Sequence, residues 1–148
     1  ERLSSKVIGV FGRKLVRFGQ SGKMLVAEGI QQNQVWKERF SLTIGQKIKT
    51  VTVSEIAYFY SMEGITFMVL KNKSEYPIDD SLDALSKDLN PVNFFRINRK
   101  YLVKIESIAN VHIFPKSHLK LELNPLPKEE VFVSIDKVTA FKNWLDNK

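Results

Sequence analysis

From residue 40 to the C-terminus, apolar and polar side chains alternate in short runs separated by turn-forming residues. A period of two is typical of strands with one buried face, and short runs joined by turn residues indicate hairpins. Ile56–Ser61 and Ile65–Leu70 are apolar on both faces, which predicts buried central strands. The pattern predicts strands at residues 40–44, 48–53, 56–61, 65–70, 75–78, 94–97, 101–103, 108–114, 119–123 and 131–133.

Two segments of this region have helical spacing instead. The apolar residues that share a helical face are Leu82, Leu85 and Leu89 in the first segment and Val138, Phe141 and Leu145 in the second. Asp80 or Ser81 can cap the first helix, and Ser134 can cap the second. About eight to ten short strands with two short helices predict a mainly β (α+β) domain of antiparallel sheets. Hairpin connections argue against a parallel, doubly wound sheet and its nucleotide crevice.

Residues 1–39 lack the strand pattern. One helical stripe in them consists of Leu3, Val7, Phe11, Leu15 and Phe18. Because two glycines interrupt this stripe, a helix here needs packing against another surface. We therefore expect a partly helical N-terminal connector at residues 1–39, followed by one domain at residues 40–148. The stripe can pack on its own domain, dimerise with a second copy, or lie on a membrane surface.

The chain of 148 residues carries a net charge of +7 and contains no cysteine and two histidines. The absence of cysteine excludes disulfides, thiol nucleophiles and thiolate metal sites, and it fits a cytoplasmic protein. The first 39 residues carry eight basic and three acidic side chains, so most of the positive excess lies there. A basic balance favours polyanionic partners such as nucleic acid or an anionic membrane, although a well-solubilised surface gives the same excess.

Enzyme chemistry has little support in the sequence. No glycine-rich phosphate loop of common spacing is present. His112 and His118 flank a turn, but two imidazoles without clustered carboxylates make a poor metal site. Asp79-Asp80 and Glu129-Glu130 are adjacent pairs, which a strand would direct to opposite faces; helix capping and a solvated loop account for them. We expect no enzymatic activity, no cofactor and no metal.

The segment FFRINRKYLVKIESI, residues 94–108, is the most informative part of the chain. Apolar runs bracket a short polar, cationic tip, which predicts a loop held between two strands. Such a loop can place an Arg fork and an Asn amide against base edges and a Lys against phosphate. The candidate DNA-binding residues of this segment are Arg96, Asn98, Arg99, Lys100 and Lys104. A basic turn can equally be a solvated feature of the surface, and Arg96 can serve the fold by pairing with a carboxylate.

Three blocks of the sequence, taken in order, resemble the LytTR family, the DNA-binding output domains of LytR/AgrA-type bacterial response regulators. The blocks are VSEIAYFYSMEGITFMVLKNKSEYPIDDSLDALSKDL, FFRINRKYLVKIESI and VFVSIDKVTAFKNWL. The resemblance covers residues 40–145. It implies an elongated arrangement of antiparallel sheets whose loops enter successive major grooves of DNA.

Carried over by position, the resemblance implies three DNA-contact places. The first is the turn at 61–66, with Ser61, Glu63 and Thr66; the second is the loop at 98–100. The third is the start of the last helix, residues 134–138, where the family often has Arg and this chain has Ile135, so that Lys137 is the nearest cation. Other departures from the family pattern are Asn98 in place of His, Lys100 in place of Ser and Lys104 in place of Asn.

The resemblance therefore implies sequence-specific binding of double-stranded promoter DNA by the output domain of a bacterial transcriptional regulator, as a homodimer on repeated sites. The receiver domain or sensor kinase of such a system does not fit within the residues before position 40. We expect it to lie outside this chain, which would then be an output domain with its connector. Two alternatives stay open: a membrane-associated regulator with a basic N-terminal segment, and a non-enzymatic β-domain that binds protein.

Overall fold

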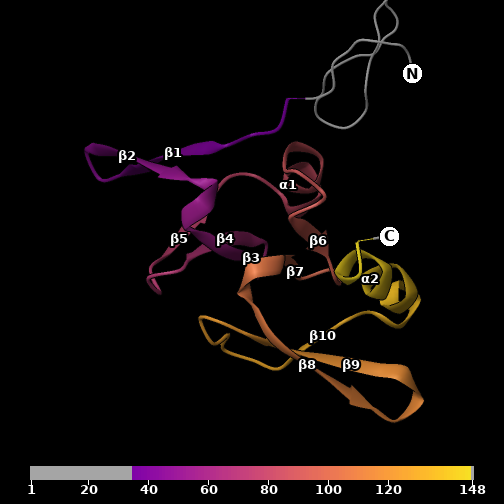
Figure 1. Cartoon of the computed structure of the whole chain (residues 1–148). Coiled ribbons are helices and arrows are strands. Elements are labelled where there is room, and N and C mark those ends of the chain that lie inside the picture. Colours follow the sequence, from indigo (N-terminus) through magenta and orange to yellow (C-terminus); the bar gives the residue numbers. More distant parts are fainter. Residues whose placement is uncertain (1–34, 148) are drawn as a thin grey trace, which may run out of the picture. The chain divides into compact units, whose positions relative to one another are not determined.

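The computed structural model describes residues 35–147 of the chain, and the residues from 37 onward among them form one compact unit. The coloured ribbon of Figure 1 follows the described residues. The helical stripe predicted near the N-terminus lies outside the described residues, and so does the dimerisation that was considered for it.

The described residues form ten strands, two α-helices and four single 3₁₀ turns. The strands are β1 (Arg39–Ile44), β2 (Lys47–Thr52), β3 (Ile56–Met62), β4 (Ile65–Leu70), β5 (Glu75–Ile78), β6 (Phe94–Arg96), β7 (Tyr101–Lys104), β8 (Ile108–Phe114), β9 (His118–Leu123) and β10 (Val131–Phe132). The helices are α1 (Leu82–Asp88) and α2 (Val138–Leu145), and the 3₁₀ turns are Val53–Glu55, Ile105–Ser107, Pro115–Ser117 and Ile135–Lys137. Each predicted strand is confirmed, and its ends agree within one residue.

The strands form three separate antiparallel sheets (Figure 1). The central sheet has the order β5-β4-β3-β7-β6, the second has the order β10-β9-β8, and β1 pairs with β2 alone. Every pairing is antiparallel, so the prediction of a mainly β domain without a parallel sheet is confirmed.

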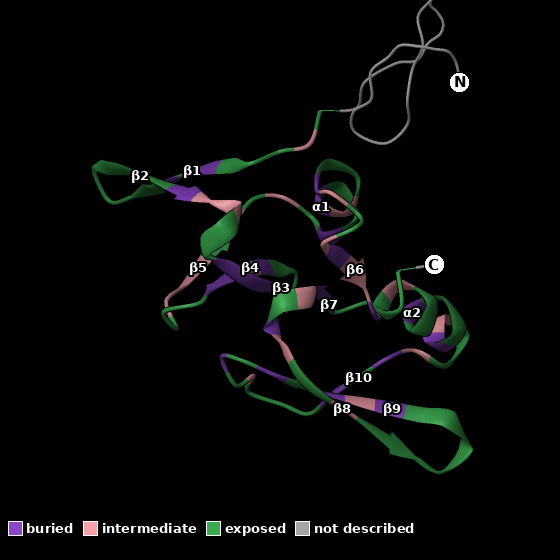
Figure 2. Ribbon diagram, in the orientation of Figure 1, coloured by how far each residue is buried: buried purple, intermediate pink, exposed green. Residues whose placement is uncertain are grey.

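Strand β3 lies between two hydrophobic cores, because its neighbouring side chains point to opposite faces of the central sheet. Tyr58 and Tyr60 pack in the core that includes the β9 leucines and Phe141 of α2. Phe59 packs in the other core, with Phe40 of β1 and Leu85 of α1. Both faces of β3 are thus buried, as the sequence pattern predicts, and the strand is purple along most of its length in Figure 2.

The helix caps agree with the sequence in one case and differ in the other. Ser81 caps α1, since its hydroxyl accepts a hydrogen bond from the amide of Ala84 at 3.1 Å. The predicted cap by Ser134 is wrong: its side chain makes no capping bond. The physical reason is the 3₁₀ turn that precedes α2, in which the amide of Lys137 donates to the carbonyl of Ser134 at 2.8 Å.

Candidate nucleic-acid interface

The loop between β6 and β7 is fixed by the side chain of Asn98. Its Oδ1 accepts hydrogen bonds from the amides of Lys100, at 2.7 Å, and Tyr101, at 2.9 Å. Its Nδ2 donates to the carbonyl of Phe132 at 2.6 Å. An Asn side chain that bonds the backbone two residues ahead is a common way to build a turn. Both ends of the Asn98 amide are therefore engaged in holding the loop, and the base contact suggested for Asn98 stays a prediction.

Arg96 holds the same loop from the side. Its Nε donates to the carbonyl of Asn98 at 2.8 Å, and its Nη2 donates to the carbonyl of Arg99 at 2.9 Å. Its Nη1 donates to Oδ1 of Asp83 at 2.6 Å. This hydrogen bond, together with the charge of Arg96, lowers the pKa of Asp83 below its ordinary value. The guanidinium of Arg96 is thus bonded within the protein. Its bond to Asp83 is the pairing with a carboxylate that the sequence analysis gives as the structural alternative for Arg96.

The three places implied by the family resemblance meet at this loop. The amide of Ser61, in the first place, donates to the carbonyl of Lys100 at 2.8 Å. From the third place, the amide of Ser134 donates to the carbonyl of Ile97 at 2.9 Å, and Nζ of Lys137 donates to the carbonyl of Arg96 at 3.2 Å. Segments far apart in sequence are therefore joined into one hydrogen-bonded surface.

A shallow cavity of about 280 Å³ brings several of the candidate residues together. Its lining includes Ser61, Thr66, Arg96, Arg99, Asp79, Asp80 and Asp83. The side chain of Arg99 is exposed, and among residues 35–147 nothing forms a hydrogen bond or ion pair with its guanidinium. Arg99 is therefore available to a ligand, whereas Thr66 is only 7% exposed.

The other candidate cations have partners within the protein. Lys100 is exposed and pairs with Glu129 at 2.7 Å, a surface contact that phosphate can compete with. Lys104 is 5% exposed, and its ammonium donates to the carbonyl of Val53 at 2.8 Å and lies 3.4 Å from Glu106. Such burial argues against a phosphate contact by Lys104.

The turn between β3 and β4 presents a carboxylate. Glu63 is exposed at its tip with φ of 52°, followed by Gly64 with φ of 79°. Two consecutive left-handed residues are the requirement of a tight hairpin turn, which Gly64 meets without strain. Glu63 can accept hydrogen bonds but cannot neutralise phosphate.

Sequence reasoning missed three residues of this interface: Asp83, Glu129 and Phe132. Asp83 anchors Arg96, Glu129 neutralises Lys100, and the Phe132 carbonyl receives the Asn98 amide. From sequence alone, Asp83 in the first turn of a helix is explained by its favourable interaction with the helix dipole. Only the folded arrangement places it beside a strand 13 residues later.

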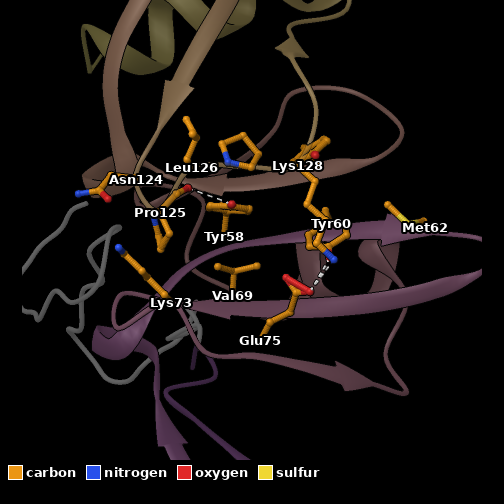
Figure 3. Close-up of a pocket in the computed structure, with 12 residues that line it drawn as sticks. Tyr58, Tyr60, Met62, Val69, Lys73, Glu75, Asn124, Pro125, Leu126 and Lys128 are labelled. Carbon is orange, nitrogen blue, oxygen red and sulfur yellow. Dashed lines mark hydrogen bonds and ion pairs between the residues drawn. The ribbon is translucent and has the colours of Figure 1, made fainter.

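A second cavity, of about 410 Å³, lies between the central sheet and the segment 124–128 (Figure 3). It is lined by Tyr58, Tyr60, Tyr101, Glu75 and Lys128, among others. The Tyr58 hydroxyl donates to the carbonyl of Pro125 at 3.0 Å, and the Tyr60 hydroxyl donates to Glu75 at 2.8 Å. Glu75 also pairs with Lys128 at 3.3 Å. These polar groups bond to one another across the cavity.

Residues 35–147 hold no group of three or more His, Asp or Glu side chains arranged to bind a metal ion. His112 is exposed beside Glu122 at 3.3 Å, and it lies opposite Lys120 rather than His118 in the hairpin. No helix in this part of the chain has the length and apolarity to cross a membrane.

The fold and the hydrogen-bonded loop surface define a small β domain that presents Arg99, whose guanidinium has no partner within residues 35–147. Comparison with protein families matches residues 46–146 to LytTR, described as the LytTr DNA-binding domain. The chain belongs to the LytTR family of DNA-binding domains, as its sequence blocks suggest.

A solved structure supports the fold. The chain is similar to the LytTr DNA-binding domain of a protein described as a methyl-accepting/DNA response regulator from Bacillus cereus, with a TM-score of 0.64 and 20% identity. The similarity covers 74% of this chain and 97% of that one. Comparison with curated protein sequences gives no match.

Proposed function

We propose that this domain binds double-stranded promoter DNA sequence-specifically, as the output domain of a bacterial transcriptional regulator, and that it does so without catalysis. The observation that carries the proposal is Arg99: an exposed guanidinium without a partner in the described chain, on a loop whose backbone is held by Asn98 and Arg96. Membership of a DNA-binding family supplies the ligand class.

Arg99 is assigned to base readout. A guanidinium can donate two parallel hydrogen bonds to O6 and N7 of guanine in the major groove, a contact worth about 1–3 kcal/mol of discrimination. A loop already held in place before binding loses less conformational entropy when DNA arrives. The arrangement therefore favours a specific contact over a loose electrostatic one.

The remaining candidates receive different roles. Lys100 exchanges Glu129 for a phosphate, and Lys137, at the start of the last helix, contributes positive charge nearby. Glu63 can only accept, so its exposed carboxylate faces the amino group of a cytosine. In the complete proposal the loops enter successive major grooves, and two copies bind repeated sites.

Selection of bound duplexes from a random library, followed by salt titration, tests this function. We expect the selected site to bind with log K falling against log salt by several units, at about −0.9 per neutralised phosphate. A scrambled duplex should bind weakly. A salt slope near zero, or equal binding of both duplexes, would contradict the proposal. Anionic vesicles serve as the comparison: binding to them in preference to DNA would favour the membrane alternative.

A further inference from the structure

The two peptide groups that flank the Cα of Arg99 are both held by one side chain. The carbonyl of Asn98 belongs to the peptide before Arg99, and the carbonyl of Arg99 belongs to the peptide after it. Arg96 donates to both, at 2.8 and 2.9 Å. Because φ and ψ of Arg99 are the rotations between these two peptide planes, Arg96 restricts the direction in which the Arg99 side chain leaves the backbone.

Arg96 is itself oriented by Asp83. The third part of its guanidinium donates to the Asp83 carboxylate at 2.6 Å, and the two side chains are 21% and 83% exposed. Asp83 lies in the first turn of α1, between Leu82, which is buried, and Ala84, whose amide bonds to the Ser81 cap. The carboxylate thus stands on a helix that is anchored independently of the loop.

We propose that Asp83 and Arg96 form a positioning pair, which presets the backbone around Arg99 so that its guanidinium meets a base edge in one orientation. This inference rests on the proposed function. Neither side chain of the pair contacts DNA in it: Arg96 acts through Arg99, and Asp83 acts through Arg96.

Because Asp83 is negatively charged, a positioning role and a purely electrostatic role predict opposite changes in DNA affinity when the charge is removed. Asp83 and Asp79 both line the cavity beside Arg99, so both place negative charge near the DNA phosphates. On electrostatics alone, removal of either carboxylate would tighten DNA binding. A positioning role gives the opposite result for Asp83, because loss of its charge releases Arg96.

The experiment compares Asp83→Asn with the matched control Asp79→Asn, which removes the same charge from the same cavity without a bond to Arg96. We expect Asp83→Asn to weaken binding to the selected site roughly tenfold while leaving the scrambled duplex unchanged or slightly tighter. Asp79→Asn should weaken binding to neither the selected nor the scrambled duplex. Arg96→Lys, which keeps the cation but cannot grip two carbonyls and a carboxylate, should resemble Asp83→Asn.

Two further readouts separate positioning from other roles. In an Arg99→Ala background, Asp83→Asn should have no additional effect on specific binding, because the residue it acts through is gone. The salt slope of Arg96→Lys should equal that of the wild type, and that of Asp83→Asn should equal the Asp79→Asn slope. Melting curves of all variants accompany the titrations.

Several results would overturn the inference: tighter specific binding by Asp83→Asn, additive losses with Arg99→Ala, or unfolding of both positioning variants. If Arg99→Ala itself loses no specificity, the proposed function of the loop fails. If only Asp83→Asn and Arg96→Lys are without effect, the function stands and the positioning pair alone is refuted.

Discussion

Two cavities in the described part of the chain, one over the tyrosines and one beside Arg99, differ in how their polar groups are paired. The cavity of about 410 Å³ over the tyrosines contains hydroxyls, a carboxylate and an ammonium, but Tyr58, Tyr60, Glu75 and Lys128 bond to one another or to the backbone. The cavity of about 280 Å³ contains Arg99, whose guanidinium has no partner within residues 35–147.

Polar groups that bond to one another stabilise the fold, whereas an exposed donor without a partner on a fixed backbone is available to bind a ligand. Around Arg99, the hydrogen bonds of Arg96 and Asn98 go to main-chain carbonyls and amides, which fixes the loop and leaves one side chain unused. Around the tyrosines, the polar groups bond to one another or to the backbone. We therefore expect changes in the first region to alter DNA binding and changes in the second to alter stability.

The largest expected effect is alkaline destabilisation through the tyrosine cavity. Burial raises the pKa of Tyr58, Tyr60 and Tyr101 above the ordinary value of about 10, and Glu75 or Glu129 adds to each shift. Because these pKa values are raised in the folded state, the neutral phenols contribute their full stability below pH ~10. That contribution is lost as the pH rises further, since the unfolded chain ionises while the folded one resists.

Thermal melting between about pH 8 and 12 checks this expectation. The melting temperature should fall steeply above pH ~10, and ultraviolet titration should show tyrosine ionisation coinciding with unfolding. Unfolding that begins well below the ionisation of the tyrosines would contradict the assignment.

The next largest effect concerns Arg99 itself. Arg99→Ala should cost about 1–3 kcal/mol on the selected duplex and relax preference at one base pair, because a bidentate contact to guanine is lost. Stability should change by no more than about 0.5 kcal/mol, as for other exposed substitutions. Binding isotherms on the selected and scrambled duplexes, with melting curves, measure both. An equal loss on the two duplexes would make Arg99 a phosphate contact.

A smaller effect is expected from Tyr58→Phe, which tests the opposite side of the comparison. The substitution removes the hydrogen bond to the Pro125 carbonyl and should lower the free energy of unfolding by about 1 kcal/mol. DNA binding should be unchanged, and the alkaline fall in melting temperature should become shallower. Denaturant unfolding and duplex titration give the two readouts; weakened DNA binding by the folded variant would join the two cavities functionally.

Much of this fold could be predicted from the sequence, since period-two runs, turn residues and helical spacing are local signals. The doubly apolar runs of β3 and β4 correctly indicated a central position in the sheet. Ser134 was harder to predict, because a Ser before a helical pattern does not reveal an intervening 3₁₀ turn. Its amide instead bonds to the Ile97 carbonyl, a contact between segments 37 residues apart.

The sequence singles out the loop at residues 98–100 as the candidate site, but it does not show which groups its side chains bond to in the fold. By residue type, Arg96, Asn98, Arg99 and Lys100 are all candidates for contacts with DNA. In the fold, however, the side chains of Arg96 and Asn98 bond to main-chain carbonyls. Lys104 looks exposed by residue type, yet the strand directs its ammonium to the carbonyl of Val53. These distinctions depend on tertiary hydrogen bonds, for which one sequence carries no local signal.

The smallest expected effect concerns Lys100, the cation in the loop between β6 and β7 that pairs with Glu129 at the surface. Lys100→Ala should weaken selected and scrambled duplexes about equally and lower the salt slope by about one unit, because a phosphate contact carries no base information. Glu129→Gln should do the reverse: freed from its pair at 2.7 Å, Lys100 should bind all duplexes slightly tighter, with preference among bases unchanged. Salt titrations of both variants on both duplexes measure this. A change in base preference by either variant would show that Lys100 shares the readout role given to Arg99.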